Sequence, residues 1–254
     1  MLARLEQLLY SLNNMNIKRN INYYKDLCLD VFVPDKSNNK CFVHFHGGGL
    51  VEGSKDDVDD LMIHLANKGF TMVNVNYSLY PNTKFPKFLK EAAKAVRWTF
   101  DNISKNIYLS GQSAGAYIIM MLAMNPEYLK GVGLTPFDIK GFVSDSGQMS
   151  DHFHVQQYEL GLNPWLQRIT EFSPIYYVNK DIKSNPILLI YYSNDMLNRK
   201  EQNLMLFNLV KYYNPKLDIT AIELQGNHVD GSCKKDKDDE YPYVKEVIKW
   251  IEER

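Results

Sequence analysis

The pentapeptide Gly111-Gln112-Ser113-Ala114-Gly115 constrains the fold of this chain more than any other stretch. A short apolar run at residues 107–109 precedes it, and a run rich in alanine, isoleucine and methionine follows it. This order predicts a strand, a sharp turn and a helix, and the two glycines let the strand and the helix pass close together. The pattern is typical of a nucleophile elbow, which lifts a serine hydroxyl above the carboxyl edge of a sheet.

Apolar runs and amphipathic segments alternate along the rest of the chain. Strands are expected at residues 28–33, 41–46, 70–77, 106–110, 140–144, 187–192 and 218–224, and helices at residues 85–100, 114–124, 201–213 and 244–253. A further helix should follow the capping-box pattern at residues 54–57 and end at Gly69. Strands that alternate with helices predict an α/β fold with a mainly parallel sheet covered on both faces.

The segment at about residues 145–185 interrupts this alternation. It is long and rich in aromatic residues, where a short helical connection would be expected. Loops of this length inside a compact domain are usually functional or contain helices of their own. We therefore expect a single domain over residues 1–254, with this segment forming a small cap over the site.

Composition narrows the class of protein. The net charge of -1 offers no basic face for nucleic acid. The three cysteines are scattered and odd in number, so no disulfide framework is predicted, and Cys28 and Cys41 are expected in the core. Residues 1–10 resemble an amphipathic helix rather than a secretory signal, and no apolar window is long enough to span a membrane. A cytoplasmic location is the simplest interpretation, although a protein that had lost a leader peptide would look similar.

A serine hydroxyl is a weak nucleophile and needs a base, which in turn needs an orienting acid. In folds with this elbow, the order along the chain is serine, acid, histidine. Asp195 follows the expected strand at 187–192, and His228 follows the expected strand at 218–224. Ser113, Asp195 and His228 are therefore the predicted catalytic residues.

Other titratable residues leave alternatives open. Asp230 is the second candidate for the acid, although it lies close to the predicted base along the chain. His152 and His154 precede the acid, which is the wrong order. His44 is expected to be a core histidine with its hydrogen bonds satisfied, and His64 has no partner that the sequence identifies.

Two pairs of histidines raise the question of a metal. His44 with His46, and His152 with His154, are each separated by one residue, which on a strand points both rings to one face. A zinc site needs further ligands, and neither an HExxH pattern nor paired cysteines supply them. We expect neither a metal nor a cofactor.

The glycine triplet Gly47-Gly48-Gly49 ends the expected strand at 41–46. Glycines at the end of a buried strand let the backbone bend and leave amide N–H groups free to face a cavity. A flexible turn is the alternative interpretation of such a triplet.

Several motifs together resemble one known family. They are His46-Gly47-Gly48-Gly49, Gly53-Ser54-Lys55, Asn76-Tyr77-Ser78-Leu79-Tyr80-Pro81, Phe85-Pro86, Gly111-Gln112-Ser113-Ala114-Gly115 and Gly226-Asn227-His228. From about Tyr23 onward the chain resembles the HGGG-type, hormone-sensitive-lipase-like esterases of the α/β-hydrolase fold. The small acetyl-esterase, feruloyl-esterase-like and kynurenine-formamidase-like members are closest in appearance.

The resemblance implies further roles for individual residues. The amides of Gly47, Gly48 and Ala114 would form the oxyanion hole, and His46 would hold the glycine loop. The chain departs from the family at two positions, because Ser78 stands where arginine is common and Glu91 where aspartate is usual. These departures imply that a structural arginine–aspartate tie is missing here.

These observations predict a serine carboxylic-ester hydrolase that acts on small acyl esters, with acetylated or feruloylated carbohydrate as a candidate substrate. An arylformamidase-like amidase is the first alternative, because the same triad cleaves formamides. A non-catalytic ligand-binding protein on a hydrolase scaffold is the second. The sequence does not indicate an oligomeric state.

Overall fold

The computed structural model describes residues 15–254. The amphipathic helix expected at residues 1–10 lies outside the described residues. Within the described part, no helix is both long and apolar enough to cross a bilayer.

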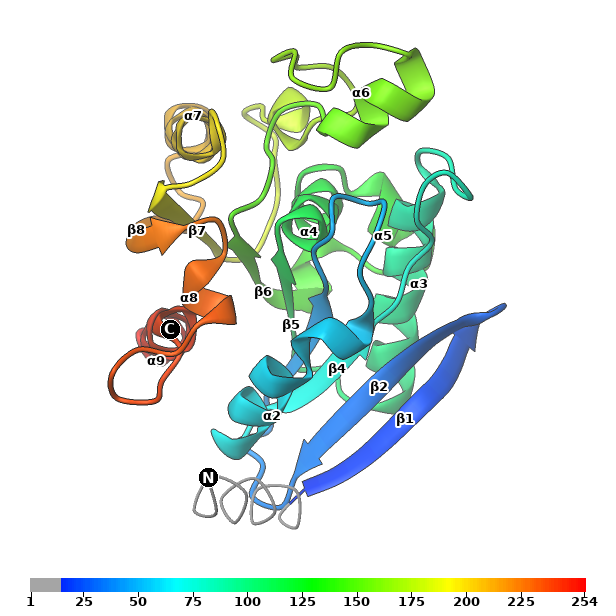
Figure 1. Cartoon of the computed structure of the whole chain (residues 1–254), viewed down its shortest axis with the longest axis vertical. Coiled ribbons are helices and arrows are strands. Elements are labelled where there is room, and N and C mark those ends of the chain that lie inside the picture. Colours follow the sequence, from blue (N-terminus) through cyan, green and yellow to red (C-terminus); the bar gives the residue numbers. More distant parts are fainter. Residues whose placement is uncertain (1–14) are drawn as a thin grey trace.

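Within residues 15–254, eight strands form one sheet in the order β1-β2-β4-β3-β5-β6-β7-β8. Their bounds are β1 (Met15–Tyr24), β2 (Leu27–Pro34), β3 (Cys41–Phe45), β4 (Thr71–Val75), β5 (Ile107–Gln112), β6 (Ile139–Asp145), β7 (Ile187–Asn194) and β8 (Ile219–Asn227). The pairs β1–β2 and β2–β4 are antiparallel, and all the other pairs are parallel. The mainly parallel sheet is thus confirmed, and the carboxyl ends of β5 to β8 meet at one edge (Figure 1).

Helices cover both faces of the sheet, as predicted. The α-helices are α2 (Asp59–Asn67), α3 (Lys87–Asn102), α4 (Ala114–Met124), α5 (Glu127–Lys130), α6 (Phe153–Leu160), α7 (Arg199–Tyr213), α8 (Asp230–Cys233) and α9 (Pro242–Glu252), and the 3₁₀ turns are η1 (Lys55–Val58), η2 (Pro136–Asp138) and η3 (Pro174–Tyr177). Helices α3, α4 and α7 lie on one face of the sheet, and α2 and α9 lie on the other (Figure 1). Apolar side chains of α3, α4 and α7 belong to one core, and those of α2 and α9 belong to a second core.

The central helix α4 has no polar face. All eleven of its residues are buried. A helix that is apolar on every side belongs in the interior of a protein. Contacts on every side of α4 therefore hold its first turn in place, and this turn begins directly after Ser113.

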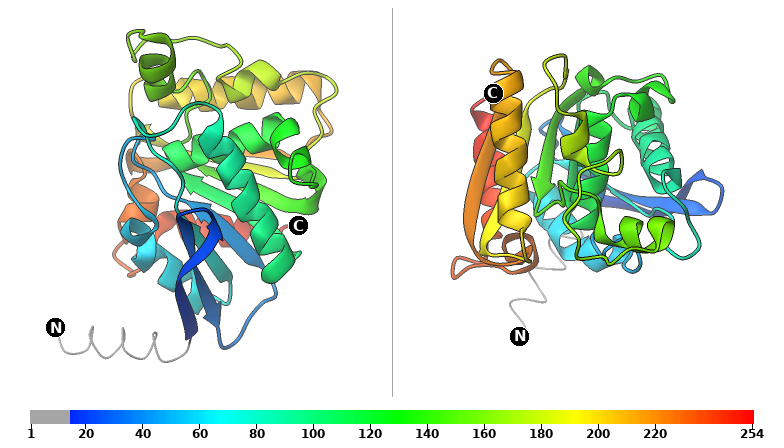
Figure 2. Two further views of the ribbon diagram at one scale, coloured as in Figure 1. Left: turned by 90° about the vertical axis from the view of Figure 1, so that its right-hand side faces the viewer. Right: turned by 90° about the horizontal axis from the view of Figure 1, so that it is seen from above.

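Strand β1 was not predicted. It lies at the edge of the sheet (Figure 2). Its residues alternate only weakly between buried and exposed positions. Its pairing with β2 is interrupted by a register shift between Lys18 and Ile21. An edge strand with one solvated face and a bulge carries a weak hydrophobic signal, because only one side of the strand is buried.

Two other predictions need correction. Cys41 is buried as expected, but Cys28 is only half-buried because it lies near the start of β2 beside the edge strand. His64 does have a partner, since its Nε2 lies 2.8 Å from Oε2 of Glu240 in the loop before α9. The two residues are 176 positions apart in the sequence, so no local pattern indicates the contact.

The segment between β6 and β7 contains α6 and η3, and α6 lies at the same end of the molecule as α7 (Figures 1 and 2). A carboxylate on α6 attaches it to the body of the domain. Oε1 of Glu159 accepts hydrogen bonds from the Tyr80 hydroxyl (2.6 Å) and the Phe85 amide (2.7 Å). The ring of Tyr158 stacks on Tyr80 with centroids 4.7 Å apart.

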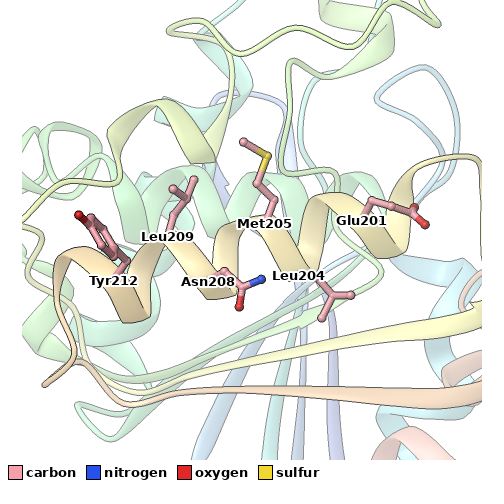
Figure 3. A pocket seen from close by; sticks show the side chains of 6 residues that line it. All are labelled: Glu201, Leu204, Met205, Asn208, Leu209 and Tyr212. Atoms are coloured by element: carbon pink, nitrogen blue, oxygen red, sulfur yellow. The ribbon is translucent and has the colours of Figure 1, made fainter.

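The outer face of α7 carries a shallow surface hollow (Figure 3). Its lining residues are Glu201, Leu204, Met205, Asn208, Leu209 and Tyr212. None of them is among the predicted site residues.

Candidate catalytic site

Ser113 occupies the turn between β5 and α4. Its φ of +52° lies in a region that residues other than glycine rarely adopt. The amide of Ser113 donates to the Asp145 carbonyl at the end of β6 (2.8 Å), which ties the turn to the neighbouring strand. This is the local geometry of a nucleophile elbow.

The structure brings the three predicted catalytic residues together. Nε2 of His228 lies 2.8 Å from Oγ of Ser113, and Nδ1 of His228 lies 2.6 Å from Oδ1 of Asp195. Each residue directly follows or ends a parallel strand, so the shared carboxyl edge of the sheet places them side by side. Their catalytic role stays a prediction.

The alternative acid is engaged elsewhere. Asp230 accepts a hydrogen bond from the Asn227 amide (2.9 Å) and pairs with Lys234 (2.8 Å). It therefore shapes the loop that carries His228 rather than orienting the imidazole.

The carboxylate of Asp195 is almost fully buried. Burial by itself raises the pKa of this carboxyl, but hydrogen bonds from His228 and Ser146 outweigh it and hold the pKa below its ordinary value. The amides of Met196 and Tyr192 also donate to the carboxylate, at 2.7 and 3.3 Å. Asp195 is thus held in its ionised form, as an orienting acid must be.

Ser146 is the residue of this site that the sequence did not reveal. Its Oγ lies 2.5 Å from Oδ2 of Asp195 and 2.8 Å from Nδ1 of His228. The available signal was its position, because Ser146 directly follows β6 at the same edge of the sheet.

The predicted oxyanion amides surround the serine. Gly47 lies so close to Ser113 that a Cβ at Gly47 would be 3.5 Å from the serine Cβ. Gly48 has a φ of +95°, and a Cβ there would lie 2.0 Å from the carbonyl oxygen of Glu52, so only glycine fits. Among residues 15–254, no acceptor takes a hydrogen bond from the amides of Gly47, Gly48 or Ala114. Their role as oxyanion donors stays a prediction.

His46 supports the glycine loop. Its Nδ1 lies 2.7 Å from the Gly47 carbonyl, and its ring stacks on Tyr77 with centroids 4.4 Å apart. Burial lowers the pKa of His46 to about 4, so the ring is neutral near pH 7. A neutral, buried and stacked ring suits the predicted structural role.

His44 is only partly as expected. It is fully buried, and its Nδ1 lies 2.9 Å from the Ser110 hydroxyl. Its Nε2 has no hydrogen-bond partner among the described residues. Burial lowers the pKa of His44 to about 3, which leaves the ring neutral.

The two histidines of the segment between β6 and β7 contact different parts of the domain. His152 is buried against Tyr117, with ring centroids 4.9 Å apart. Nδ1 of His154 makes a short hydrogen bond with the Gly49 carbonyl. This segment is therefore in direct contact with the glycine loop.

A cleft of about 410 Å³ opens over the serine. It is lined by His46, Gly47, Gly48, Glu52, Gly53, Asp57, Val58, Gln112, Ser113, His228, Val229 and Cys233. Two carboxylates and no lysine or arginine are among these lining residues.

One group of potential metal ligands is present in the described part of the chain. It consists of Asp30, Asp56 and Asp59. Lys55 bonds to Asp30 and Asp56, and Arg19 bonds to Asp30 and Asp59, so cationic side chains already occupy this group. It lies outside the residues that line the cleft.

Comparison with known proteins identifies the fold family of the chain. A family described as having the alpha/beta hydrolase fold matches residues 42–206, more than half of the chain. The chain therefore belongs to the α/β-hydrolase family.

Two relatives are acetyl esterases of Salmonella paratyphi B and Salmonella schwarzengrund. Each is 28% identical over 108 residues, which cover 40% of this chain and 33% of the relative. The match thus spans about a third of the length of these relatives.

Solved structures show the same fold. Esterase B from Lactobacillus rhamnosis aligns with a TM-score of 0.75 at 14% identity, over 98% of this chain and 91% of that one. An esterase from Pyrobaculum calidifontis aligns with a TM-score of 0.69 at 22% identity, over 98% and 88% of the two chains.

Proposed function

We propose that this protein is a serine carboxylic-ester hydrolase acting on small acyl esters. The observation that carries the proposal is the continuous hydrogen-bonded series from Ser113 through His228 to Asp195. A serine, a base and an orienting acid in this geometry are the working parts of acyl transfer. Similarity to proteins named acetyl esterases supports acetyl as the first acyl group to test.

The chemistry begins at the serine hydroxyl. Ser113 Oγ attacks the ester carbonyl while Nε2 of His228 takes the hydroxyl proton. Asp195 holds the Nδ1–H and stabilises the imidazolium that forms. The same Nε2–H then protonates the leaving alcohol, and water repeats the cycle on the acyl-enzyme.

Backbone amides would stabilise the negative charge that develops on the carbonyl oxygen. The amides of Gly47, Gly48 and Ala114 have no acceptor among the described residues, so they are available for that oxygen. Each well-aimed donor lowers the barrier by about 3 to 4 kcal/mol.

We also propose that the segment at residues 145–185 forms a cap within a single domain. Support comes from the bond of His154 to the glycine loop and from the bonds of Glu159 to Tyr80 and Phe85. A cap held at these points limits the size of the acyl or alcohol group. The aromatic side chains of the segment offer flat surfaces for sugar or aryl esters.

The test is hydrolysis of p-nitrophenyl acetate by the wild-type protein and by Ser113→Ala. The variant should lose at least about 10⁴-fold in kcat, and a fluorophosphonate probe should label only the wild-type protein. Ser37→Ala, in an exposed turn, is the control and should keep full activity. Full turnover by Ser113→Ala would refute the assignment.

N-formylkynurenine in the same assay tests the formamidase alternative. Absence of both activities and of labelling would favour a ligand-binding role.

A further inference from the structure

The Ser146 hydroxyl contacts both Asp195 and His228, the proposed catalytic acid and base. Its Oγ is within hydrogen-bond distance of Oδ2 of Asp195 (2.5 Å) and of Nδ1 of His228 (2.8 Å). The residue is fully buried, so water does not compete for these bonds.

The positions of the protons follow from the chemistry of the three groups. An ionised carboxylate only accepts hydrogen bonds, so the Ser146 hydroxyl donates its one proton to Asp195. The remaining lone pairs of Oγ face Nδ1 of His228, and they form a hydrogen bond only if that nitrogen carries a proton. The Nδ1–H is then shared between Oδ1 of Asp195, at 2.6 Å, and Oγ of Ser146.

This arrangement selects one tautomer of the histidine. A neutral imidazole protonated at Nδ1 has an unprotonated Nε2, which is the nitrogen that accepts the Ser113 proton. If the proton moved to Nε2, Nδ1 would have no proton to donate to Asp195 or Ser146. Both acceptors therefore favour the reactive tautomer.

The backbone at Ser146 is held in place for this contact. Its φ of +55° is unusual for a residue other than glycine. The amide of Ser146 donates to the Ile190 carbonyl of the neighbouring strand β7 (2.8 Å), which fixes the residue at the edge of the sheet. Such a conformation persists when surrounding contacts require it.

Asp195 has few other partners for Oδ2. Among the described residues, only the Tyr192 amide also donates to this oxygen, over a longer distance of 3.3 Å. Two other titratable side chains act on Asp195 through space, namely the buried guanidinium of Arg199 and the buried carboxyl of Asp145. Neither makes a hydrogen bond to the carboxylate, so among the described residues Ser146 is the one side chain besides His228 that is hydrogen-bonded to it.

We propose that Ser146 is a positioning residue that aligns Asp195 and keeps His228 in the tautomer protonated at Nδ1. The kinetic part of the inference rests on the proposed hydrolase function. The tautomer part rests only on the contacts of Ser146, and it holds for this site whatever substrate the protein takes.

Ser146→Gly provides a clean test. Glycine suits the positive φ, so the variant removes the hydroxyl without adding backbone strain. We expect kcat for p-nitrophenyl acetate to fall roughly 10- to 100-fold with KM changed less than about twofold, as suits the loss of a hydrogen bond to a charged group. The unfolding temperature should stay near that of the wild-type protein.

The direct readout is the protonation of the imidazole nitrogens. Long-range ¹H–¹⁵N NMR of ¹⁵N-histidine protein distinguishes the two tautomers, and His228→Gln assigns the signals. The wild-type protein should show the Nδ1–H form of His228, and Ser146→Gly should show a mixture of both forms.

Ser144→Ala is the matched control. Ser144 lies two residues earlier on β6, is also fully buried, and its Oγ has no hydrogen-bond partner among the described residues. Its removal should change neither kcat nor the tautomer. The proposal is overturned if Ser146→Gly keeps the wild-type kcat or keeps the wild-type tautomer.

The experiment also separates two kinds of failure. If the wild-type protein neither hydrolyses esters nor reacts with a fluorophosphonate, the proposed function fails. The NMR comparison still decides the role of Ser146, because it needs no substrate.

Discussion

The Cα of Gly115 in α4 packs directly against the main-chain carbonyl of Phe45 at the end of β3. A Cβ on Gly115 would lie 1.9 Å from that oxygen, far closer than two atoms can approach. This contact brings the first turn of α4 beside the glycine loop. It therefore sets the distance between Ser113 and the amides of Gly47 and Gly48.

Gly115→Ala should disrupt this contact. The neighbour is backbone rather than the end of a flexible side chain, so the strand or the helix must move. We expect the free energy of unfolding, measured by urea unfolding, to fall by more than about 3 kcal/mol, and we expect the proposed hydrolysis of p-nitrophenyl acetate to be lost.

Gly131→Ala serves as the control for this prediction. Gly131 ends α5 with a helical φ of −59°, and a Cβ on this residue would lie 3.4 Å from its nearest neighbours, which is ordinary contact. That substitution should be neutral or slightly stabilising, because alanine restricts the unfolded chain. Wild-type stability and activity in Gly115→Ala would show that the helix and strand are not in tight contact.

Much of the site could be predicted because its residues adjoin strands. Ser113, Asp195 and His228 each follow an apolar run, and parallel strands bring their carboxyl ends to one edge. The glycine triplet marks the same edge. Local patterns thus located these residues, since the sheet converts position along a strand into position in space.

Other features depend on contacts that no local pattern records. Ser146 reaches Asp195 and His228 only because β6 lies beside β7 in the sheet. A single serine after a strand looks like any turn residue. The link between Ser78 and Glu91 is another such feature, because each residue taken alone is only a departure from the family pattern.

Ser78 and Glu91 form a tie of their own. The carboxylate of Glu91 accepts hydrogen bonds from the Ser78 amide (3.0 Å) and the Ser78 hydroxyl (2.9 Å). The missing arginine–aspartate tie is therefore replaced by a serine–glutamate tie.

Loss of this tie should destabilise the fold. Glu91 is buried, and Glu91→Ala leaves the Ser78 amide without its acceptor, so the free energy of unfolding should fall by about 2 kcal/mol. Ser78→Ala keeps the amide bond and should cost about 1 kcal/mol. Glu127→Ala, at an exposed ion pair with Lys130, should change stability by less than about 0.5 kcal/mol. Equal values for Glu91→Ala and Glu127→Ala in urea unfolding would refute the role of the tie.

Asp145 should make stability depend on pH. This carboxyl is fully buried beneath the site and accepts hydrogen bonds from the hydroxyls of Tyr192 and Ser232. Burial raises the pKa of Asp145 to about 7, although both hydrogen bonds act in the opposite direction. The ordinary pKa of an aspartate in an unfolded chain is about 3.9. Between that pH and about 7, the folded protein therefore keeps a proton on Asp145 that the unfolded chain has already lost.

The contribution of Asp145 to stability is consequently full below about pH 4 and is lost as the pH rises to about 7. Relative to Asp145→Asn, the wild-type free energy of unfolding should fall by up to about 1.4 kcal/mol per pH unit between pH 5 and 7, and then level off. Urea unfolding at several pH values checks this expectation. Asp181→Asn, at an exposed position, is the control, and a constant difference between wild type and Asp145→Asn across this range would contradict the prediction.

The cleft should prefer substrates that carry a positive charge. Glu52 and Asp57 both line it and are exposed, and no lysine or arginine shares the lining. The Glu52 carboxylate has no hydrogen bond or ion pair within residues 15–254, while Asp57 accepts one bond from the Ser54 amide (2.7 Å). The nearby Lys55 does not compensate, because Asp30 and Asp56 already hold its ammonium group.

Acetylcholine, which is the acetate ester of choline, and its uncharged isostere 3,3-dimethylbutyl acetate have nearly the same shape. The ratio of their kcat/KM values therefore isolates the effect of charge. A unit charge about 8 Å away contributes roughly 0.5 kcal/mol in water, so neutralising both carboxylates should lower this ratio about threefold to tenfold. We expect that change in the Glu52→Gln, Asp57→Asn double variant, with the rate for the uncharged ester nearly constant. Added salt should lower the wild-type ratio in the same direction, because it screens exposed charges. Asp60→Asn, on the exposed side of α2 and outside the cleft, should leave the ratio unchanged. If the double variant and the wild-type protein give the same ratio, the two carboxylates do not select the substrate.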